Sequence, residues 1–231
     1  MVAVVLLPGM DGSGVLFDEF ASELDCRSIV ISYPTDRPFG YEELEHHVRS
    51  LLPADESLIL LAESFSGPLA IALAANPPPQ LKALVLVCTF ARFPVPSFAL
   101  PCFKALGLLP LWRAPMSLAS RMLFGRFRSE AKEAVLSRAI RAVTPQVWRA
   151  GLKAVLSIDK TSSLCHIRVP LLYLRASEDR VVFSSASAVI SARVPGTKVV
   201  SIEGPHFLLQ SKPQECAAAV RAFAREMKDE P

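Results

Sequence analysis

The sequence lacks the features that mark several common classes of protein. Its five cysteines are widely spaced, with no CxxC pair and no Cys/His cluster, so neither a disulfide framework nor a zinc site is indicated. Its longest apolar runs fall far short of the ~18 residues that suggest a membrane span. No GxGxxG spacing opens a helix, and no phosphate-loop Lys-Ser or Lys-Thr follows the glycine-rich stretch near the start, which argues against a nucleotide enzyme. We therefore expect no cofactor, no metal ion and no membrane span.

The composition that remains is that of a globular protein with one substantial core. The chain has 231 residues, of which 51% are hydrophobic and 20% are charged, and its mean hydropathy is +0.35. The apolar stretch at residues 2–7 has no basic segment before it and no cleavage pattern after it, so we interpret it as a first strand and not as a signal peptide. Because no disulfide framework is indicated, the expected location is the cytoplasm.

Charge is distributed unevenly along the chain. Residues 92–165 carry twelve Lys or Arg against three acidic residues, a net charge of +9, whereas the rest carries thirteen basic against nineteen acidic residues, a net charge of −6. A shift this large marks a separate structural unit. Its arginines are interleaved with Leu, Ala and Val at helical spacing, which favours amphipathic helices with a solvated basic face over a nucleic-acid surface.

Short apolar runs alternate with helical patterns along most of the chain. We expect buried strands at residues 2–7, 26–33, 58–62, 83–88, 169–176 and 197–202. Helical periodicity appears at residues 16–24, 41–52, 183–193 and 213–228, and also after the third strand. This rhythm predicts an α/β fold with a mostly parallel, doubly wound sheet covered by helices on both faces.

The alternation of strand and helix patterns stops in the basic part of the chain. From residue 93 to about residue 167 no strand-like run appears, and three amphipathic helical segments take its place. The predicted organisation is a core formed by residues 1–91 and 168–231, with a helical lid (or cap), residues 92–167, inserted into it.

The stretch around Ser64 carries the strongest sign of chemistry. An apolar run at residues 58–62 leads directly toward Ser64, and small residues and then an apolar helical run follow it. A serine on a tight turn between a strand and a helix is held exposed, which suits a nucleophile that attacks a carbonyl group. Such turns usually have glycine two residues before and two residues after the serine, whereas this chain has Ala62 and Ser66.

Two later strand ends supply candidate partners for Ser64. Asp179 lies just past the strand at 169–176, and His206 lies just past the strand at 197–202. Functional groups gather at the carboxyl ends of strands in an open parallel sheet, so we expect Ser64, Asp179 and His206 to meet there. In such a catalytic triad His206 accepts the proton of Ser64, while Asp179 fixes the imidazole tautomer and stabilises the imidazolium.

A serine nucleophile also needs hydrogen-bond donors for the negative oxygen that forms during attack. The glycine-rich loop at residues 8–14 follows the first strand, which is expected to lie next to the strand that carries Ser64. Its glycines allow close approach of the backbone. The predicted donors of this oxyanion hole are the backbone N–H groups of Met10 and of Phe65.

Over almost the whole chain these motifs resemble those of α/β-hydrolase serine hydrolases. The matching stretches are PGMDGSG as oxyanion loop, AESFSG as nucleophile turn, ASEDRVV as acid loop and EGPHFLLQ as histidine loop. Pro8 departs from the His of many members, and the nucleophile turn lacks both glycines. The resemblance implies a trimmed core, a helical lid and carboxylesterase-like activity. The basic lid is similar to that of the pimeloyl-ACP methyl ester esterases, which implies an acyl carrier protein as an alternative partner.

The predicted function is cleavage of carboxylic esters of small to medium, largely apolar substrates through an acyl-enzyme. Apolar side chains of the lid are expected to line the substrate site, chiefly Phe93, Trp112, Met116 and Trp148. One alternative is a methyl ester esterase or thioesterase that depends on an acyl carrier protein and docks it on the basic lid. A further alternative is a non-catalytic, ligand-binding member of the same fold.

Several residues compete with these assignments, and the more ordinary interpretation is favoured for each. Ser66 is a rival nucleophile but lies further into the helix, and Glu178 is a rival to Asp179 although the matching family position carries Asp. Asp11 is expected to cap local amide groups, and Glu63 to support the nucleophile turn from the side. The remaining histidines are expected to be surface or structural residues: His46, His47 and His166.

Overall fold

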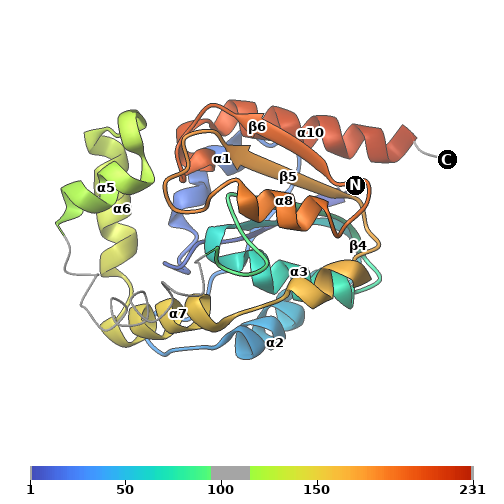
Figure 1. Cartoon of the computed structure of the whole chain (residues 1–231), viewed down its shortest axis with the longest axis horizontal. Helices are drawn as coiled ribbons and strands as arrows, with labels where there is room; N and C mark the ends of the chain where they lie inside the picture. Colours follow the sequence, from blue (N-terminus) through green and yellow to red (C-terminus); the bar gives the residue numbers. More distant parts are fainter. Residues whose placement is uncertain (1, 95–114, 230–231) are drawn as a thin grey trace.

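A sheet of six parallel strands forms the centre of the protein (Figure 1). The computed structural model describes residues 2–94 and 115–229, without the side chains of residues 228 and 229. The strands are β1 (Val2–Leu7), β2 (Ser28–Val30), β3 (Ser57–Glu63), β4 (Leu81–Val87), β5 (Leu171–Ala176) and β6 (Lys198–Ile202). Their order is β2-β1-β3-β4-β5-β6, and all neighbouring pairs are parallel. The predicted α/β class is therefore confirmed.

Unbroken apolar runs form the central strands. β1, β3 and β4 consist largely of Val, Leu, Ile and Ala, and nearly all of their side chains are buried because helices cover both faces of the sheet. β2 is shorter than the strand predicted at 26–33. It lies at an edge of the sheet, where β1 alone pairs with it, and Val30 at its end is exposed.

Helices cover the sheet in two layers. On one face pack α2 (Tyr41–Leu51), α3 (Gly67–Ala75) and α8 (Ser185–Ser191), and on the other α1 (Asp18–Ser22), α9 (Leu208–Ser211) and α10 (Pro213–Asp229). Successive residues of a strand point to opposite faces, so Leu60 of β3 packs in the first layer and Leu61 in the second. Within residues 2–94 and 115–229, no helix is long and apolar enough to cross a bilayer.

The helices begin and end close to their predicted positions. The helix predicted at 16–24 is divided: it starts as a 3-10 turn, η1 (Val15–Phe17), and continues as α1 to Ser22. Gly14 precedes η1 with φ +75°, a backbone conformation that glycine adopts without strain. Two short elements were not predicted, η5 (Thr161–His166) and α9.

The order of the strands reverses at β1. The chain passes from β1 outward to β2, returns beyond β1 to β3, and then continues in the other direction to β6. The loops that follow β1 and β3 therefore leave the same edge of the sheet as neighbours. Open α/β sheets bind ligands at such a reversal. In this chain the loop at residues 8–14 and the turn at Ser64 occupy it.

Among its described residues, the insert between β4 and β5 contains the helices α5 (Met116–Leu123), α6 (Glu130–Arg141) and α7 (Pro145–Ser157). In Figure 1, α5 and α6 stand beyond the end of the sheet toward which β5 points. The two ends of the insert lie side by side, where the Lys160 N–H donates to the Ala91 carbonyl at 2.9 Å. The insert therefore lies at the end of the sheet that carries the reversal.

The start of α3 packs so closely on the end of β4 that residue 67 has no room for a side chain. A Cβ atom at Gly67 would overlap Thr89 Oγ1 and lie 2.7 Å from Thr89 Cγ2. Gly67→Ala is therefore expected to lower the free energy of unfolding by roughly 3 kcal/mol, at the upper end for an overpacked core. Urea denaturation measures the change.

Gly40→Ala is the control for this substitution. Gly40 is exposed, and a Cβ atom there would lie 3.4 Å from the end of the flexible Glu43 side chain. We expect a loss of no more than about 1 kcal/mol, the ordinary cost of alanine at the N-cap of a helix. Equal losses at residues 40 and 67 would contradict the close packing of α3.

Candidate active site

Ser64 lies on a strained turn between a strand and a helix. β3 ends at Glu63, and the chain passes through a 3-10 turn, η2 (Ser64–Ser66), directly into α3. Ser64 has φ +49°, a left-handed conformation that costs a residue with a side chain ~1–3 kcal/mol. Among the described residues other than glycine, only Ser64 and Cys88 adopt positive φ. This is the backbone geometry expected of a nucleophile turn.

Ser64, His206 and Asp179 form a continuous chain of hydrogen bonds. Ser64 Oγ lies 2.8 Å from His206 Nε2. His206 Nδ1 lies 2.9 Å from Asp179 Oδ2 and 3.0 Å from Asp179 Oδ1. The three residues follow β3, β6 and β5, which are far apart in the sequence but end at the same edge of the sheet. The structure thus brings together the three residues that the sequence selected as a triad.

The imidazole and the carboxylate of this chain are buried, whereas the serine is accessible. The side chains of His206 and Asp179 are 2% and 5% exposed, and Ser64 is half-buried. Asp179 Oδ1 also accepts hydrogen bonds from the backbone N–H groups of Val181 and Val182, each at 2.8 Å. These bonds fix the carboxylate against the imidazole, and Ser64 is the accessible end of the hydrogen-bond chain.

The residues that competed for these positions have other partners. Glu178 accepts hydrogen bonds from Arg126 of the insert, at 3.0 Å from Nε and 2.7 Å from Nη2. His46 and His47 lie on α2 with a ring nitrogen against a backbone carbonyl group, and His166 is exposed. None of these histidines takes part in the hydrogen-bond chain of Ser64.

The loop at residues 8–14 is held by hydrogen bonds within itself. The Gly12 N–H donates to the Gly9 carbonyl at 3.0 Å, and Asp11 accepts from the N–H of Ser13 at 3.0 Å and from its hydroxyl. Burial raises the pKa of Asp11, although the hydrogen bonds from Ser13 act in the opposite direction. Asp11 therefore caps local donors, as predicted.

Ser66, at a position where glycine is usual, joins the nucleophile turn to this loop. Its buried hydroxyl donates to the Pro8 carbonyl, and its oxygen lies 2.6 Å from Tyr33 Oη. Burial raises the pKa of Tyr33, so the phenol keeps its proton and donates it to Ser66. Ser66 thus bridges the loops after β1 and β3, and its burial argues against a role as nucleophile.

Thr89, which the sequence analysis missed, sets the orientation of the Ser64–Phe65 peptide. Thr89 Oγ1 donates to the Ser64 carbonyl. The N–H and C=O groups of a trans peptide point in opposite directions, so this bond aims the Phe65 N–H away from Thr89. Tyr173 Oη accepts from the Thr89 N–H at 3.0 Å and donates to the Thr89 carbonyl at 2.6 Å. Thr89 lies just past the end of β4, so the expectation that functional groups gather at the carboxyl ends of parallel strands could have selected it. Tyr173 lies inside a strand, and nothing in the sequence around it indicated a role.

The two residues predicted to form the oxyanion hole lie against the same point of the insert. A Cβ atom at Gly151 of α7 would lie 3.1 Å from Met10 Cγ and 3.8 Å from Phe65 Cε2. The Phe65 carbonyl accepts a hydrogen bond from Tyr41 Oη at 2.8 Å, which fixes the next peptide of the turn. The role of the Met10 and Phe65 N–H groups as oxyanion donors stays a prediction.

The four apolar residues predicted to line the substrate site are placed differently from one another. Phe93 packs edge-to-face on a neighbouring phenylalanine, with ring centroids 5.2 Å apart. Trp148 donates from Nε1 to the Ile140 carbonyl at 3.3 Å, a bond within the insert. Met116 begins α5, and Trp112 lies outside the described residues. Their role toward substrate also stays a prediction.

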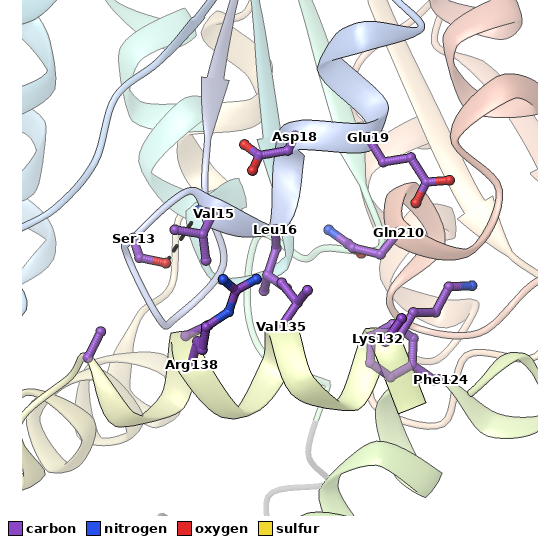
Figure 2. Close-up of a pocket in the computed structure, with 13 residues that line it drawn as sticks. Ser13, Val15, Leu16, Asp18, Glu19, Phe124, Lys132, Val135, Arg138 and Gln210 are labelled. Carbon is purple, nitrogen blue, oxygen red and sulfur yellow. Dashed lines mark hydrogen bonds between the residues drawn. The ribbon is translucent and has the colours of Figure 1, made fainter. Parts of the chain in front are cut away.

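A cavity of about 420 Å³ lies between the insert and the core (Figure 2). Val135 and Arg138 of α6 face it from one side, and Leu16 and Asp18 from the other. Gln210 reaches toward Leu16 from α9 (Figure 2). Its walls are mainly apolar, but the serine and histidine of the hydrogen-bond chain do not line it. Neither side chain is therefore part of the wall of this cavity.

Replacing Tyr173 tests the support that Thr89 receives. Tyr173→Phe removes the hydroxyl and leaves a buried N–H and a buried carbonyl of Thr89 without partners. We expect the free energy of unfolding to fall by roughly 2–4 kcal/mol, since each such group costs ~1–3 kcal/mol. Tyr41→Phe is the matched control, because its buried hydroxyl serves one carbonyl, and its cost should be about half as large. A smaller loss in Tyr173→Phe than in Tyr41→Phe, in urea titrations at one pH, would contradict the assigned support.

Solved structures with different named activities share this fold. The bromoperoxidase from Bacillus anthracis has a TM-score of 0.84 at 17% identity, covering 96% of this chain and 91% of that chain. A thermophilic esterase from Thermogutta terrifontis has a TM-score of 0.81 at 18% identity, covering 98% and 90%. At these identities the likeness concerns the fold alone, and the reaction has to be argued from the site.

Sequence comparison places the chain in a family. The biotin biosynthesis bifunctional protein BioHC from Cellvibrio japonicus is 26% identical over 186 residues, or 76% of this chain. This chain spans only about a third (36%) of that relative's length. The model of the alpha/beta hydrolase family matches residues 4–219, which include the sheet except for the first two residues of β1, and also the insert. The chain therefore belongs to the alpha/beta hydrolase family.

Proposed function

We propose that this protein is a serine hydrolase that cleaves carboxylic esters of small to medium, largely apolar substrates. The observation that carries the proposal is the path of hydrogen bonds from Ser64 through His206 to Asp179. A serine becomes a nucleophile when a base lies within hydrogen-bond reach and an acid orients that base. The left-handed turn at Ser64 and membership of the alpha/beta hydrolase family support the same reaction class.

In the first half of the proposed reaction, Ser64 attacks the ester carbonyl. His206 Nε2 accepts the Ser64 proton as the new C–O bond forms, and Asp179 stabilises the resulting imidazolium. The carbonyl oxygen becomes an oxyanion that the N–H groups of Met10 and Phe65 receive, each donor being worth ~3–4 kcal/mol. The bond to the alcohol then breaks, His206 returns the proton to the departing alkoxide, and the acyl group stays on Ser64.

In the second half, water takes the place of the alcohol. His206 accepts a proton from water as its oxygen attacks the acyl carbonyl, and the same donors receive the second oxyanion. The bond to Ser64 Oγ then breaks, and His206 returns the proton to that oxygen. The carboxylic acid leaves, and the enzyme is regenerated.

We place the substrate beneath the insert, which acts as a lid. In this proposal the lid is residues 92–167 and the core is residues 1–91 and 168–231. The approach of Gly151 to Met10 and Phe65 supports this placement, because it brings α7 over both expected oxyanion donors. The apolar side chains proposed to contact substrate are Phe93, Trp112, Met116 and Trp148.

Labelling with an organophosphate tests the nucleophile. We expect the label on Ser64, located by peptide mass spectrometry, together with loss of p-nitrophenyl ester hydrolysis. Ser64→Ala should lower kcat by about 10⁴-fold or more, since removing a triad serine costs a factor of that order or larger. An alanine variant with full activity would refute the proposal.

Ser66→Ala is the matched control, because Ser66 lies two residues away in the same turn. Its buried hydroxyl bonds to the Pro8 carbonyl and to Tyr33, and losing both bonds should lower the free energy of unfolding by roughly 2–4 kcal/mol. Labelling at Ser64 should persist in this variant. A label that appears on Ser66 in the unaltered protein would reverse the assignment of the two serines.

A second candidate function follows from the charge of the insert. An esterase or thioesterase acting on acyl groups carried by an acidic carrier protein would dock that protein on basic side chains. Exposed arginines of the insert include Arg121, Arg128, Arg138 and Arg141. Opposite charges of this kind speed association and fix its geometry. The resemblance of the lid to that of pimeloyl-ACP methyl ester esterases, and the biotin-biosynthesis name of the Cellvibrio relative, favour this candidate.

Charge reversal on α6 tests whether an acyl carrier protein docks on the insert. Arg138→Glu with Arg141→Glu should lower kcat/KM by at least about tenfold for an ester on acyl carrier protein, and little for p-nitrophenyl esters. The effect should shrink as salt screens the charges. Lys82→Glu with Arg225→Glu makes the same charge change far from the insert and should have no such effect. Equal losses with both pairs, or no preference for carrier-bound ester, would remove this candidate.

A further inference from the structure

Glu63, the residue directly before Ser64, is a buried carboxyl group that the proposed reaction does not use. Its side chain is 1% exposed and that of Gln210 is 6% exposed. Gln210 Nε2 donates to Glu63 Oε2 at 3.1 Å. The other carboxyl oxygen, Glu63 Oε1, and the amide oxygen, Gln210 Oε1, are buried without a hydrogen-bond partner among the described residues. The carboxyl group therefore has one oxygen paired and one unpaired, and the amide has its N–H group paired and its oxygen unpaired.

The protonation state of Glu63 decides whether those two oxygens can be satisfied. An ionised carboxylate only accepts hydrogen bonds, and the carbonyl oxygen of an amide also only accepts, so two acceptors would face the interior unpaired. A protonated carboxyl has one O–H group to donate. Because carboxylic acid and carboxamide are complementary, one N–H···O and one O–H···O bond would then join them and leave neither oxygen unpaired.

The surroundings of Glu63 also disfavour its charge. Asp11, in the loop after β1, is the ionisable group whose charge acts on Glu63, and Glu63 in turn raises the pKa of Cys88 after β4 and of Cys216 on α10. None of these groups is a cation. Burial, and to a lesser extent Asp11, raise the pKa of Glu63 to about 8, while the hydrogen bond from Gln210 acts in the opposite direction.

We propose that Glu63 is a neutral carboxylic acid at pH 7, paired with Gln210 through two hydrogen bonds, and that this pair positions Ser64 against His206. Glu63 adjoins Ser64 in the chain, and Gln210 lies on α9, which begins two residues after His206. The pair thus joins the nucleophile turn to the histidine loop behind the Ser64–His206 hydrogen bond. Its neutral form also keeps a negative charge away from the oxyanion. The positioning part rests on the proposed function, whereas the protonation state does not.

The pH dependence of stability tests the protonation state. A folded pKa of about 8 lies above the ordinary value of 4.5, so between these values the folded chain keeps a proton that the unfolded chain has released. Rising pH therefore favours unfolding. Relative to Glu63→Gln, which cannot ionise, the wild-type protein should lose stability in urea as the pH rises from 4.5 to 8. An increase over the same interval would show an ionised Glu63 and overturn the proposal.

Infrared difference spectra supply a readout that needs no activity. At pH 7 the wild-type protein should show the carbonyl band of a protonated carboxylic acid, and Glu63→Gln should lack it. At pH above the raised pKa the band should be replaced by carboxylate bands. A wild-type spectrum at pH 7 without this band would also overturn the proposal, whatever the protein hydrolyses.

Activity tests the positioning role. Glu63→Gln can make the same two hydrogen bonds with Gln210, so it should keep kcat within about threefold at pH 7 and should lack the fall in kcat that ionisation causes in the wild type near pH 8. Glu63→Leu and Gln210→Leu break the pair and should lower kcat at least about tenfold with little change in KM.

The matched variants separate the possible failures. If Glu63→Leu does not fold, Gln210→Leu examines the same pair from the other side. Equal activity in Glu63→Gln and Glu63→Leu, with both folded, would overturn the positioning role. Absence of ester hydrolysis in every variant and in the wild type would instead remove the proposed function, and the urea and infrared results would still decide the state of Glu63.

Discussion

Ser64 holds its left-handed conformation because contacts from two neighbouring strands fix the peptides on its C-terminal side. Thr89, at the end of β4, donates its hydroxyl to the Ser64 carbonyl, and Tyr173 of β5 holds both backbone groups of Thr89. The absence of a side chain at Gly67 lets α3 press against Thr89. The strain at Ser64, ~1–3 kcal/mol, is thus offset by buried hydrogen bonds and packing around it.

The parallel winding of the sheet explains why distant residues meet at this turn. Each strand runs in the same direction, so the loops after β1, β3, β5 and β6 all leave one edge. The insert closes against two of these loops. Arg126 binds Glu178, next to Asp179 in the loop after β5, and also Glu203, the first residue after β6. The Phe207 N–H donates to the Leu123 carbonyl at 3.0 Å, so the position of the insert and that of the histidine loop depend on each other.

Two buried carboxyl groups, those of Asp11 and Glu63, lie in the loop after β1 and directly before Ser64. Burial raises the pKa of both Asp11 and Glu63, and Asp11 raises that of Glu63 further. A reaction that creates a negative oxygen benefits when such groups are neutral, because like charges repel strongly in a poorly solvated interior. The hydrogen bonds that Asp11 accepts from Ser13 and Glu63 accepts from Gln210 lower the two pKa values and so act against burial.

The order of apolar and amphipathic segments by itself determined the α/β class, the parallel winding and the place of the helical insert, because burial on both faces of a sheet requires unbroken apolar strands. The same rule of strand ends selected Ser64, Asp179 and His206, which the structure brings into contact. Only the tertiary structure revealed Thr89 and Tyr173 as supports of the turn. Their partners are backbone groups up to 84 residues away, and such a pairing leaves no periodicity or motif in the sequence. Likewise the burial of Glu63 and its contact with Gln210 depend on how α9 folds back on β3, and no local pattern encodes that meeting.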